Sequence, residues 1–204
     1  MRRLARGSEL VVATHNRGKL EEIADLLAPY GISVSSNADH GLPEPEETEE
    51  TFAGNARIKA HAAARATGLP ALADDSGLAI DALDGAPGVH TADWAETGAG
   101  RDFAMAMARA WREIGETGTA APYPARFCCT LVLAWPDGTD AVFPGEMAGQ
   151  IVWPPRGEQG HGYDPVFQPE GYDVTFGEMD RWEKNRISHR ADAFAKFRAG
   201  CLDG

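Results

Sequence analysis

The sequence has little cysteine, a deficit of basic residues and no long apolar run. Three cysteines among 204 residues are too few to build a disulfide scaffold. Cys128 and Cys129 are neighbours in an expected strand, so their side chains point to opposite faces, and Cys201 stands near the end of the chain. We therefore expect buried thiols in a reducing compartment. The longest apolar stretch, around residues 130–135, has the length of a strand and is far too short for a membrane span.

The charge balance argues against a nucleic-acid partner. Lysine and arginine number 19 against 31 aspartates and glutamates, which gives a net charge of −12. Binding to duplex nucleic acid needs a basic face that neutralises phosphates, whereas a small anion needs only a locally basic pocket. No apolar signal core follows the initial Met-Arg-Arg before Glu9. We expect a protein of the cytoplasm with no membrane and no nucleic-acid partner.

What is present is ordinary for one globular domain over residues 1–204, with 43% hydrophobic and 25% charged residues and no internal repeat. Apolar periodicity and turn residues predict alternating strands and helices, and therefore a mixed α/β fold. The expected strands cover residues 9–14, 32–35, 71–73, 78–83, 126–135 and 141–152, the last two forming a hairpin. The expected helices cover the segment that follows Lys19 through about residue 30, and residues 52–67, 102–114 and 179–199, the last interrupted near Ser188.

The turn between the first strand and the first helix is a candidate anion site. Residues 14–19 read Thr-His-Asn-Arg-Gly-Lys. Backbone N–H groups and the positive end of a helix attract an anion there, Gly18 permits close approach, and Lys19 adds a full charge. The turn is not a Walker A loop, because Ala13 and Leu20 stand where glycine and Ser or Thr are required. The residues alone leave open that Thr14 or Asn16 merely caps the helix.

A second candidate is the run Asp74-Asp75-Ser76-Gly77, placed after the short strand 71–73. Two carboxylates at a strand end suit Mg²⁺, and one of them can accept a proton from water. The alternative is a common turn sequence.

On the helix 52–67, Asn55 and Lys59 share a face, and Lys59 can reach a phosphate or simply be solvated.

Two further motifs lie toward the C-terminus. Gly160-His-Gly-Tyr-Asp164 suggests a ligand-facing loop in which a ring stacks on a base, or else an ordinary loop that enters a strand. Ser188 can cap the last helix and present His189 and Arg190 at its start, or these residues form a charged surface.

Taken in order, these motifs resemble the inosine triphosphate pyrophosphatase family over residues 10–197. The blocks that carry the resemblance are ATHNRGKLEEI, EETFAGNARIKA, LPALADDSGLAIDALDGAPGVHTA, GHGYDPVF and TFGEMDRWEKNRISHRADAF. The resemblance implies a curved mixed β-sheet flanked by helices, two lobes with an active-site cleft between them, and a homodimer. It also implies Mg²⁺-dependent hydrolysis of ITP, dITP and XTP between the α and β phosphates.

The resemblance further implies roles for individual residues. Asp75 is the expected general base or Mg²⁺ ligand, and either Glu44 or Glu47 helps to hold the metal. The triphosphate is assigned to Thr14, His15, Asn16, Arg17, Gly18 and Lys19, with Lys59 and Ser76 also on the substrate. The base is assigned to His161, Gly162, Tyr163, Asp164, Lys184, His189 and Arg190. Position 161 departs from the family, which more often has phenylalanine there.

Two other functions fit parts of the sequence. A related pyrophosphatase of the septum-formation-inhibitor group would act on pyrimidine or modified triphosphates, but the block Ser188-His-Arg argues against it. A non-catalytic nucleotide-binding module would have no use for a base beside the metal, so Asp74, Asp75 and Lys19 argue against that reading.

Overall fold

The computed structural model describes residues 2–15 and 17–202, which form two compact units. The first unit contains the described residues up to Asp75, residues Thr130–Pro144 and those from Ala193 on. The second unit contains Ser76–Cys129 and Gly145–Asp192. Three long strands contribute residues to both units: β3 (Ala71–Ile80), β7 (Tyr123–Ala134) and β8 (Asp140–Ile151).

The main sheet is mixed, as the sequence predicted. Its strand order is β2-β1-β3-β7-β8-β9, and β4 pairs with β3 outside this path. β1 (Glu9–Val12) runs parallel to β2 (Ser33–Ser36) and to β3, whereas β9 (Phe167–Pro169) is antiparallel to β8 and β4 (Pro87–Gly88) is antiparallel to β3. β7 and β8 are joined by a short turn in which Trp135 N–H donates to Thr139 O at 2.9 Å, so the expected hairpin is confirmed.

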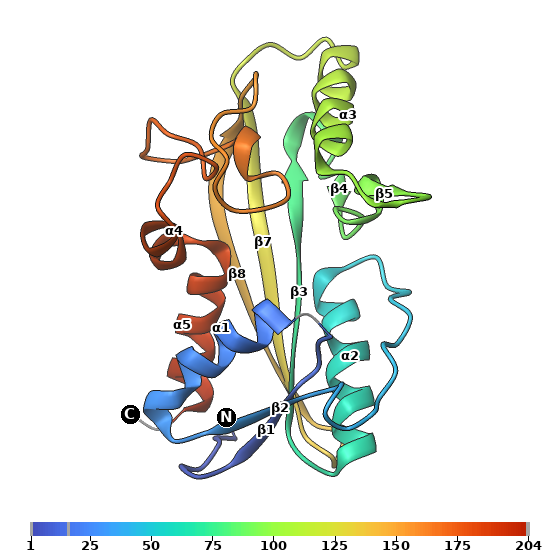
Figure 1. The fold of residues 1–204 in the computed structure, drawn as a ribbon, viewed down its shortest axis with the longest axis vertical. Coiled ribbons are helices and arrows are strands. Elements are labelled where there is room, and N and C mark those ends of the chain that lie inside the picture. The colour runs from blue at the N-terminus through green and yellow to red at the C-terminus, as the bar shows by residue number, and fades with distance from the viewer. Residues whose placement is uncertain (1, 16, 203–204) are drawn as a thin grey trace. The chain divides into compact units, whose positions relative to one another are not determined.

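In the first unit, helix α2 (Phe52–Thr67) lies along the sheet through a row of alanines (Figure 1). The buried alanines allow close packing because they carry only a methyl group, and they contact small residues of β1, β3 and β7; the helix members are Ala56, Ala60, Ala63 and Ala64. Thr51 Oγ1 caps the helix by accepting from Gly54 N–H at 3.0 Å. The helix ends at Gly68, whose φ of 71° is left-handed and suits glycine.

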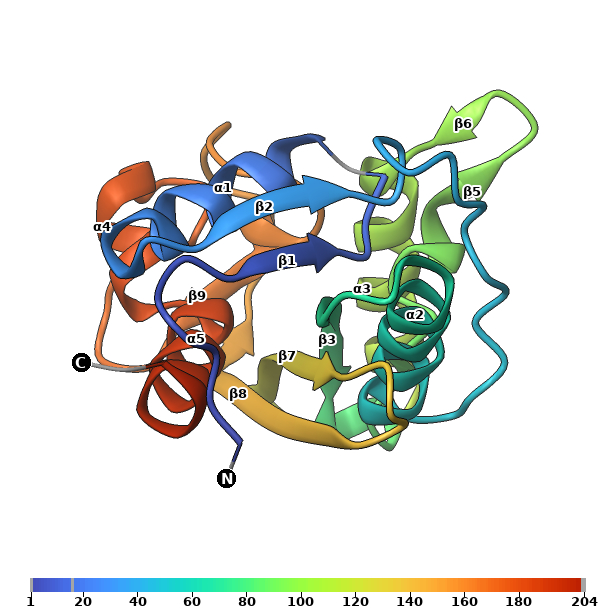
Figure 2. The same ribbon diagram turned by 90° about the horizontal axis from the view of Figure 1, so that it is seen from below.

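The opposite face of the first unit is covered by α1 (Arg17–Leu27) and by the part of α5 (His189–Cys201) from Ala193 on (Figure 2). Phe143 of β8 meets Phe197 of α5 edge to face, with ring centroids 5.4 Å apart. This face and the alanine face bury alternate residues of each strand, as expected for a sheet covered on both sides.

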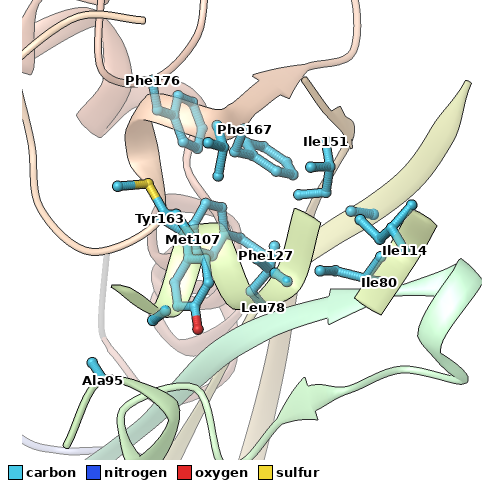
Figure 3. Packing of buried hydrophobic residues seen from close by; sticks show 14 of the residues in the cluster. Leu78, Ile80, Ala95, Met107, Ile114, Phe127, Ile151, Tyr163, Phe167 and Phe176 are labelled. Carbon is cyan, nitrogen blue, oxygen red and sulfur yellow. The ribbon is translucent and has the colours of Figure 1, made fainter. Parts of the chain in front are cut away.

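The second unit has its own core, built around three phenylalanine rings (Figure 3). Phe127 of β7 lies 4.6 Å from Phe167 and 6.0 Å from Phe176, measured between ring centroids. Helix α3 (Phe103–Glu116) packs on this core and is capped by Asp102, which accepts from Met105 N–H at 3.0 Å. The unit also holds the small pair β5 (Glu96–Thr97) and β6 (Gly100–Arg101) and helix α4 (Arg181–Ile187).

The predicted strand boundaries between residues 71 and 83 were wrong. The sequence suggested that the strand at residues 71–73 ends in a turn at 74–77, but β3 continues from Ala71 to Ile80. The predicted strand 78–83 also stops at Ile80 and is followed by a 3₁₀ turn (Asp81–Leu83). Asp74 and Asp75 stay inside the strand because both are buried and both are paired with lysines, as shown below.

Other expectations are confirmed. The last helical segment is interrupted at Ser188, whose Oγ accepts from Ala191 N–H at 3.3 Å and caps α5. Cys128, Cys129 and Cys201 are buried and form no disulfide. In the part of the chain that the structure describes, no helix combines the length and the apolar character needed to cross a bilayer.

The alanine face of α2 leads to a prediction about stability. Ala60→Leu should lower the free energy of unfolding by about 1–3 kcal/mol, because three extra carbons have no space against the sheet. Ala66→Leu is the matched control, since Ala66 is exposed on the same helix and should change stability by less than about 0.5 kcal/mol. Urea denaturation of both variants measures the difference. Equal effects would show that the helix is not packed tightly there.

Candidate active site

The two carboxylates of β3 point to opposite faces of the sheet. In the parallel ladder Val11 lies beside Ala71 and Val12 beside Leu72. Side chains alternate along a strand, so Asp75 shares the face of Ala71 and Ala73, which α2 covers, and Asp74 shares the other face. Adjacent positions in the sequence therefore supply charge to two different environments.

Each carboxylate is matched by a lysine from a helix. Lys19 of α1 forms an ion pair with Asp74, whose side chain is only 3% exposed. Lys59 of α2 donates to Asp75 Oδ1 at 3.3 Å and to Glu47 Oε1 at 2.7 Å. Lys59 is itself buried, which a solvated helix lysine would not be. The structure thus gathers Glu47, Lys59 and Asp75 into one group of charges.

The second carboxylate oxygen of Asp75 is the distinctive atom of this group. Oδ2 is buried and has no hydrogen-bond partner in the described part of the chain. A buried acceptor without a donor costs about 1–3 kcal/mol in a folded protein. Such an atom is suited to a water molecule, a metal ion or a reacting group.

Burial also changes the acidity of the group. Desolvation raises the pKa of Asp75 to about 6, with a further contribution from the negative charge of Glu47, while Lys59 opposes the shift. Burial acts to lower the pKa of Lys59, but the carboxylates of Asp75 and Glu47 outweigh it and the net shift is upward. Above pH 6 Asp75 is therefore ionised yet more basic than an ordinary aspartate.

The donor atoms fit a hard divalent cation only in part. No group of three or more His, Cys, Asp or Glu side chains is gathered at metal-binding spacing among the described residues. Mg²⁺ does not require such a cage, since it takes one or two carboxylates and fills its other positions with water and phosphate oxygens. Asp75 Oδ2, which has no hydrogen-bond partner among the described residues, and the nearby carboxylate of Glu47 meet that need.

The geometry separates the two candidate glutamates. Glu47 is linked to Asp75 through Lys59. Glu44 instead lies 3.8 Å from Nδ1 of His15, and its side chain is 62% exposed. Glu47 is therefore the glutamate that shares an environment with the candidate base.

The turn at residues 14–19 contributes unevenly to this cluster. Lys19 pairs with Asp74 on the other face of the sheet, whereas Arg17 is exposed in α1 and pairs with Glu21 at 2.9 Å. Thr14 N–H donates to Val12 O, and His15 contacts the acidic loop through its ring. Gly18 lies in the first turn of α1, and Asn16 falls outside the described residues.

In the second unit, a buried carboxylate organises the loop at residues 160–164. Asp164 is 2% exposed, accepts from His161 N–H at 2.8 Å and forms an ion pair with Lys184. Lys184 Nζ also lies 5.2 Å from the centre of the Phe176 ring. Gly160 has a left-handed φ of 74°, and a Cβ there would collide with the Asp164 carboxylate, so only glycine fits. Gly162 is also left-handed, with φ of 70°.

The sequence suggested that a ring of the loop at residues 160–164 stacks on a base, but the rings of this region differ in whether they are exposed. Tyr163 is 1% exposed and packs edge to face on Phe103, so its ring belongs to the core and is not available to stack on a base (Figure 3). Burial also raises the pKa of its phenol. His161 is the exposed ring of the loop. His189 is largely buried and stacks on Phe127, with centroids 5.0 Å apart.

Two further predicted residues, Ser76 and Arg190, lie beside these groups in the sequence. Ser76 follows Asp75 in β3 and is partly buried, and Arg190 is partly buried near the start of α5. The sequence did not reveal that Asn55 Oδ1 accepts from Glu49 N–H at 2.9 Å, nor that Phe127 supports His189. Only the shared helix face of Asn55 and Lys59 hinted at the first contact.

A groove of about 740 Å³ also lies in the second unit. Its walls include Arg126, Gln150, Gln168 and Tyr172. None of the site residues predicted from the sequence lines it, within the described part of the chain.

The raised pKa of Asp75 predicts how stability depends on pH. Folding raises this pKa, so the stabilisation from the protonated form is present below about pH 4 and is lost as pH rises through 6. Asp75→Asn cannot ionise, so in metal-free buffer its stability relative to the wild type should improve by about 2–3 kcal/mol between pH 4 and pH 8. Denaturant titrations at both pH values measure this change, and a pH-independent difference would contradict it.

The chain is similar to known proteins over almost its whole length. The model of the Ham1 family matches residues 10–200. The dITP/XTP pyrophosphatase of Ruegeria pomeroyi is 67% identical over the full length of both chains, and that of Agrobacterium fabrum is 57% identical over 95% of this chain and 96% of its own. A HAM1 protein from Coxiella burnetii has a similar structure, with a TM-score of 0.89 and 36% identity, covering 94% of this chain and 97% of that one. The resemblance inferred from the sequence is confirmed, and the chain belongs to the Ham1 family.

Proposed function

We propose that this chain hydrolyses the damaged purine nucleoside triphosphates ITP, dITP and XTP to the monophosphate and pyrophosphate, and so keeps them out of DNA and RNA. The observation that carries the proposal is Asp75, a buried carboxylate with one oxygen on Lys59 and the other without a partner. Relatives named dITP/XTP pyrophosphatase are 54–67% identical to the chain over almost its whole length. A cluster that can activate water is what such a name requires.

Asp75 is suited to take the proton of the attacking water. Its pKa of about 6 leaves it ionised at neutral pH and still basic enough to accept a proton. Lys59 fixes Oδ1, so Oδ2 has a defined direction in which to meet water. Placement of this kind lowers the barrier because the base need not be reoriented during the reaction.

The lysines and a metal share the charge of the triphosphate. We propose Mg²⁺ held by Asp75 and Glu47, and when bound it would neutralise phosphate charge and favour ionisation of water. Lys19, near the start of α1, would attract the phosphates, and Lys59 would hold the carboxylates of Glu47 and Asp75 in position. A substrate oxygen near Lys19 would replace part of its interaction with Asp74.

We assign recognition of the base to the second unit. His161 presents an exposed ring, while Asp164 and Lys184 fix the loop that carries it. Hypoxanthine and xanthine bear a 6-keto oxygen that accepts hydrogen bonds, whereas adenine bears an amino group at that position. Donors from His189 or Arg190 would be satisfied by the keto group and left unpaired against adenine.

Two parts of the proposal rest on the family alone. We propose that the protein is a homodimer and that it works in the cytoplasm, where damaged nucleotides meet the polymerases. Light scattering coupled to size-exclusion chromatography would give the mass in solution, for comparison with 21.8 kDa for one chain.

The identity of the products tests the proposal. With Mg²⁺, ITP should yield IMP and pyrophosphate, and dTTP and ATP should react far more slowly. Asp75→Asn should lower kcat by about 100-fold or more, because it removes both charge and basicity, whereas Asp93→Asn, at an exposed aspartate, should not. Chromatography showing IDP and orthophosphate, or preferred hydrolysis of dTTP, would reject the assignment. Binding of ITP without any product would favour a non-catalytic module.

Base selection gives a further prediction. Arg190→Ala should lower kcat/KM for ITP by about 10- to 100-fold, the range for a hydrogen bond to a charged donor, and should affect ATP much less. Steady-state kinetics with both nucleotides measure the ratio. Equal losses on ITP and ATP would place Arg190 on the phosphates or in the stability of α5, and would refute its role in base recognition.

A further inference from the structure

The acidic loop between β2 and α2, residues 37–51, has no regular helix or strand but is held at several points. At its C-terminal end, Asn55 Oδ1 accepts from Glu49 N–H at 2.9 Å and Lys59 pairs with Glu47 at 2.7 Å. Both anchoring side chains are buried on α2. The segment that carries Glu47 is therefore tied to the helix beside it.

The N-terminal end of the loop is tied elsewhere. His15 Nε2 lies 3.0 Å from Leu42 O, and its Nδ1 lies 3.8 Å from Glu44 Oε2. A carbonyl oxygen only accepts, so Nε2 carries the hydrogen and donates it. The ring of His15 thus contacts the loop, and His15 itself lies four residues before Lys19 in the sequence.

We infer that His15 is a positioning residue that latches the acidic loop onto the turn carrying Lys19, and thereby presents Glu47 to Asp75. The family resemblance assigned His15 to the triphosphate, whereas its contacts here are to residues 42 and 44. Backbone hydrogen bonds form a turn at the start of the loop, where Leu42 N–H donates to Asn37 O at 3.0 Å. His15 ties this turn to the segment that leads into α1, so loss of His15 would loosen the loop between the turn and the Lys59–Glu47 pair. The inference rests on the proposed function, because it gives Glu47 a role toward metal and substrate.

Hydrogen exchange tests the latch without turnover. In His15→Ala, the amides of Leu42 and Glu49, which donate to Asn37 O and to Asn55 Oδ1, should exchange several-fold faster than in the wild type, because the contact to Leu42 O is gone. His15→Gln keeps an N–H donor near the position of Nε2 and should restore protection. His40→Ala is the matched control, since this exposed histidine of the same segment contacts Ser35 at 2.8 Å and not the part of the loop that carries Glu47.

Kinetic constants distinguish a positioning role of His15 from a role in overall stability alone. His15→Ala should raise KM for ITP and the half-saturating Mg²⁺ concentration by about five- to tenfold, the size of one hydrogen bond, with kcat within about threefold of the wild type. His15→Gln should recover most of this loss, and His40→Ala should show none of it.

The outcomes separate the possibilities. Unchanged exchange at the amides of Leu42 and Glu49 in His15→Ala would overturn the latch. Normal exchange in His15→Gln together with the full rise in KM would also overturn it, because His15 would then act on the phosphates directly. The variants can show the expected exchange pattern while the wild-type protein releases no pyrophosphate from ITP. That result would support the latch and reject the proposed function.

Discussion

The fold of the first unit depends on how two adjacent carboxylates are kept inside a β-strand. Asp74 and Asp75 point to opposite faces of β3, and each is neutralised by a lysine from the helix that covers its side. An unpaired buried carboxylate would be too costly to keep ionised, so α1 and α2 must supply Lys19 and Lys59 at these positions. The closeness of α2 to the sheet, made possible by its alanines, is what allows the Lys59 amine to reach Asp75.

The same arrangement contains one feature that is unfavourable for stability, the carboxylate of Asp75. Among the described residues, one oxygen of Asp75 is buried without a hydrogen-bond partner, and burial holds the pKa of this carboxyl near 6. An asparagine would bring no charge into the interior, but it could not accept a proton. The cost of this unpaired oxygen is local, because Lys59 and Glu47 restrain the carboxylate. The caps at Thr51 and Gly68 and the alanine contacts stabilise the helix that bears Lys59. Functional sites commonly show such a departure from the most stable arrangement.

Much of the fold could be predicted from the sequence, because local signals marked it. The bounds of α2 followed from its alanine-rich run and Gly68, and the break at Ser188 followed from a capping residue. The continuous strand through Asp74 and Asp75 could not be predicted, since its stability depends on two lysines distant in sequence. For the same reason the sequence left Glu44 and Glu47 undecided and could not show that the Tyr163 ring is buried in the core.

The division of the chain into two units has a consequence for how such enzymes diversify. The residues proposed for the phosphate chemistry, Asp75, Lys59 and Lys19, lie in the first unit, whereas the residues proposed for the base lie in the second. On this proposal, substitutions around His161 or Arg190 would alter which nucleobase is accepted and leave Asp75, Lys59 and Lys19 untouched. A scaffold of this kind can acquire a new substrate range by drift in one region, under constant selection for hydrolysis in the other.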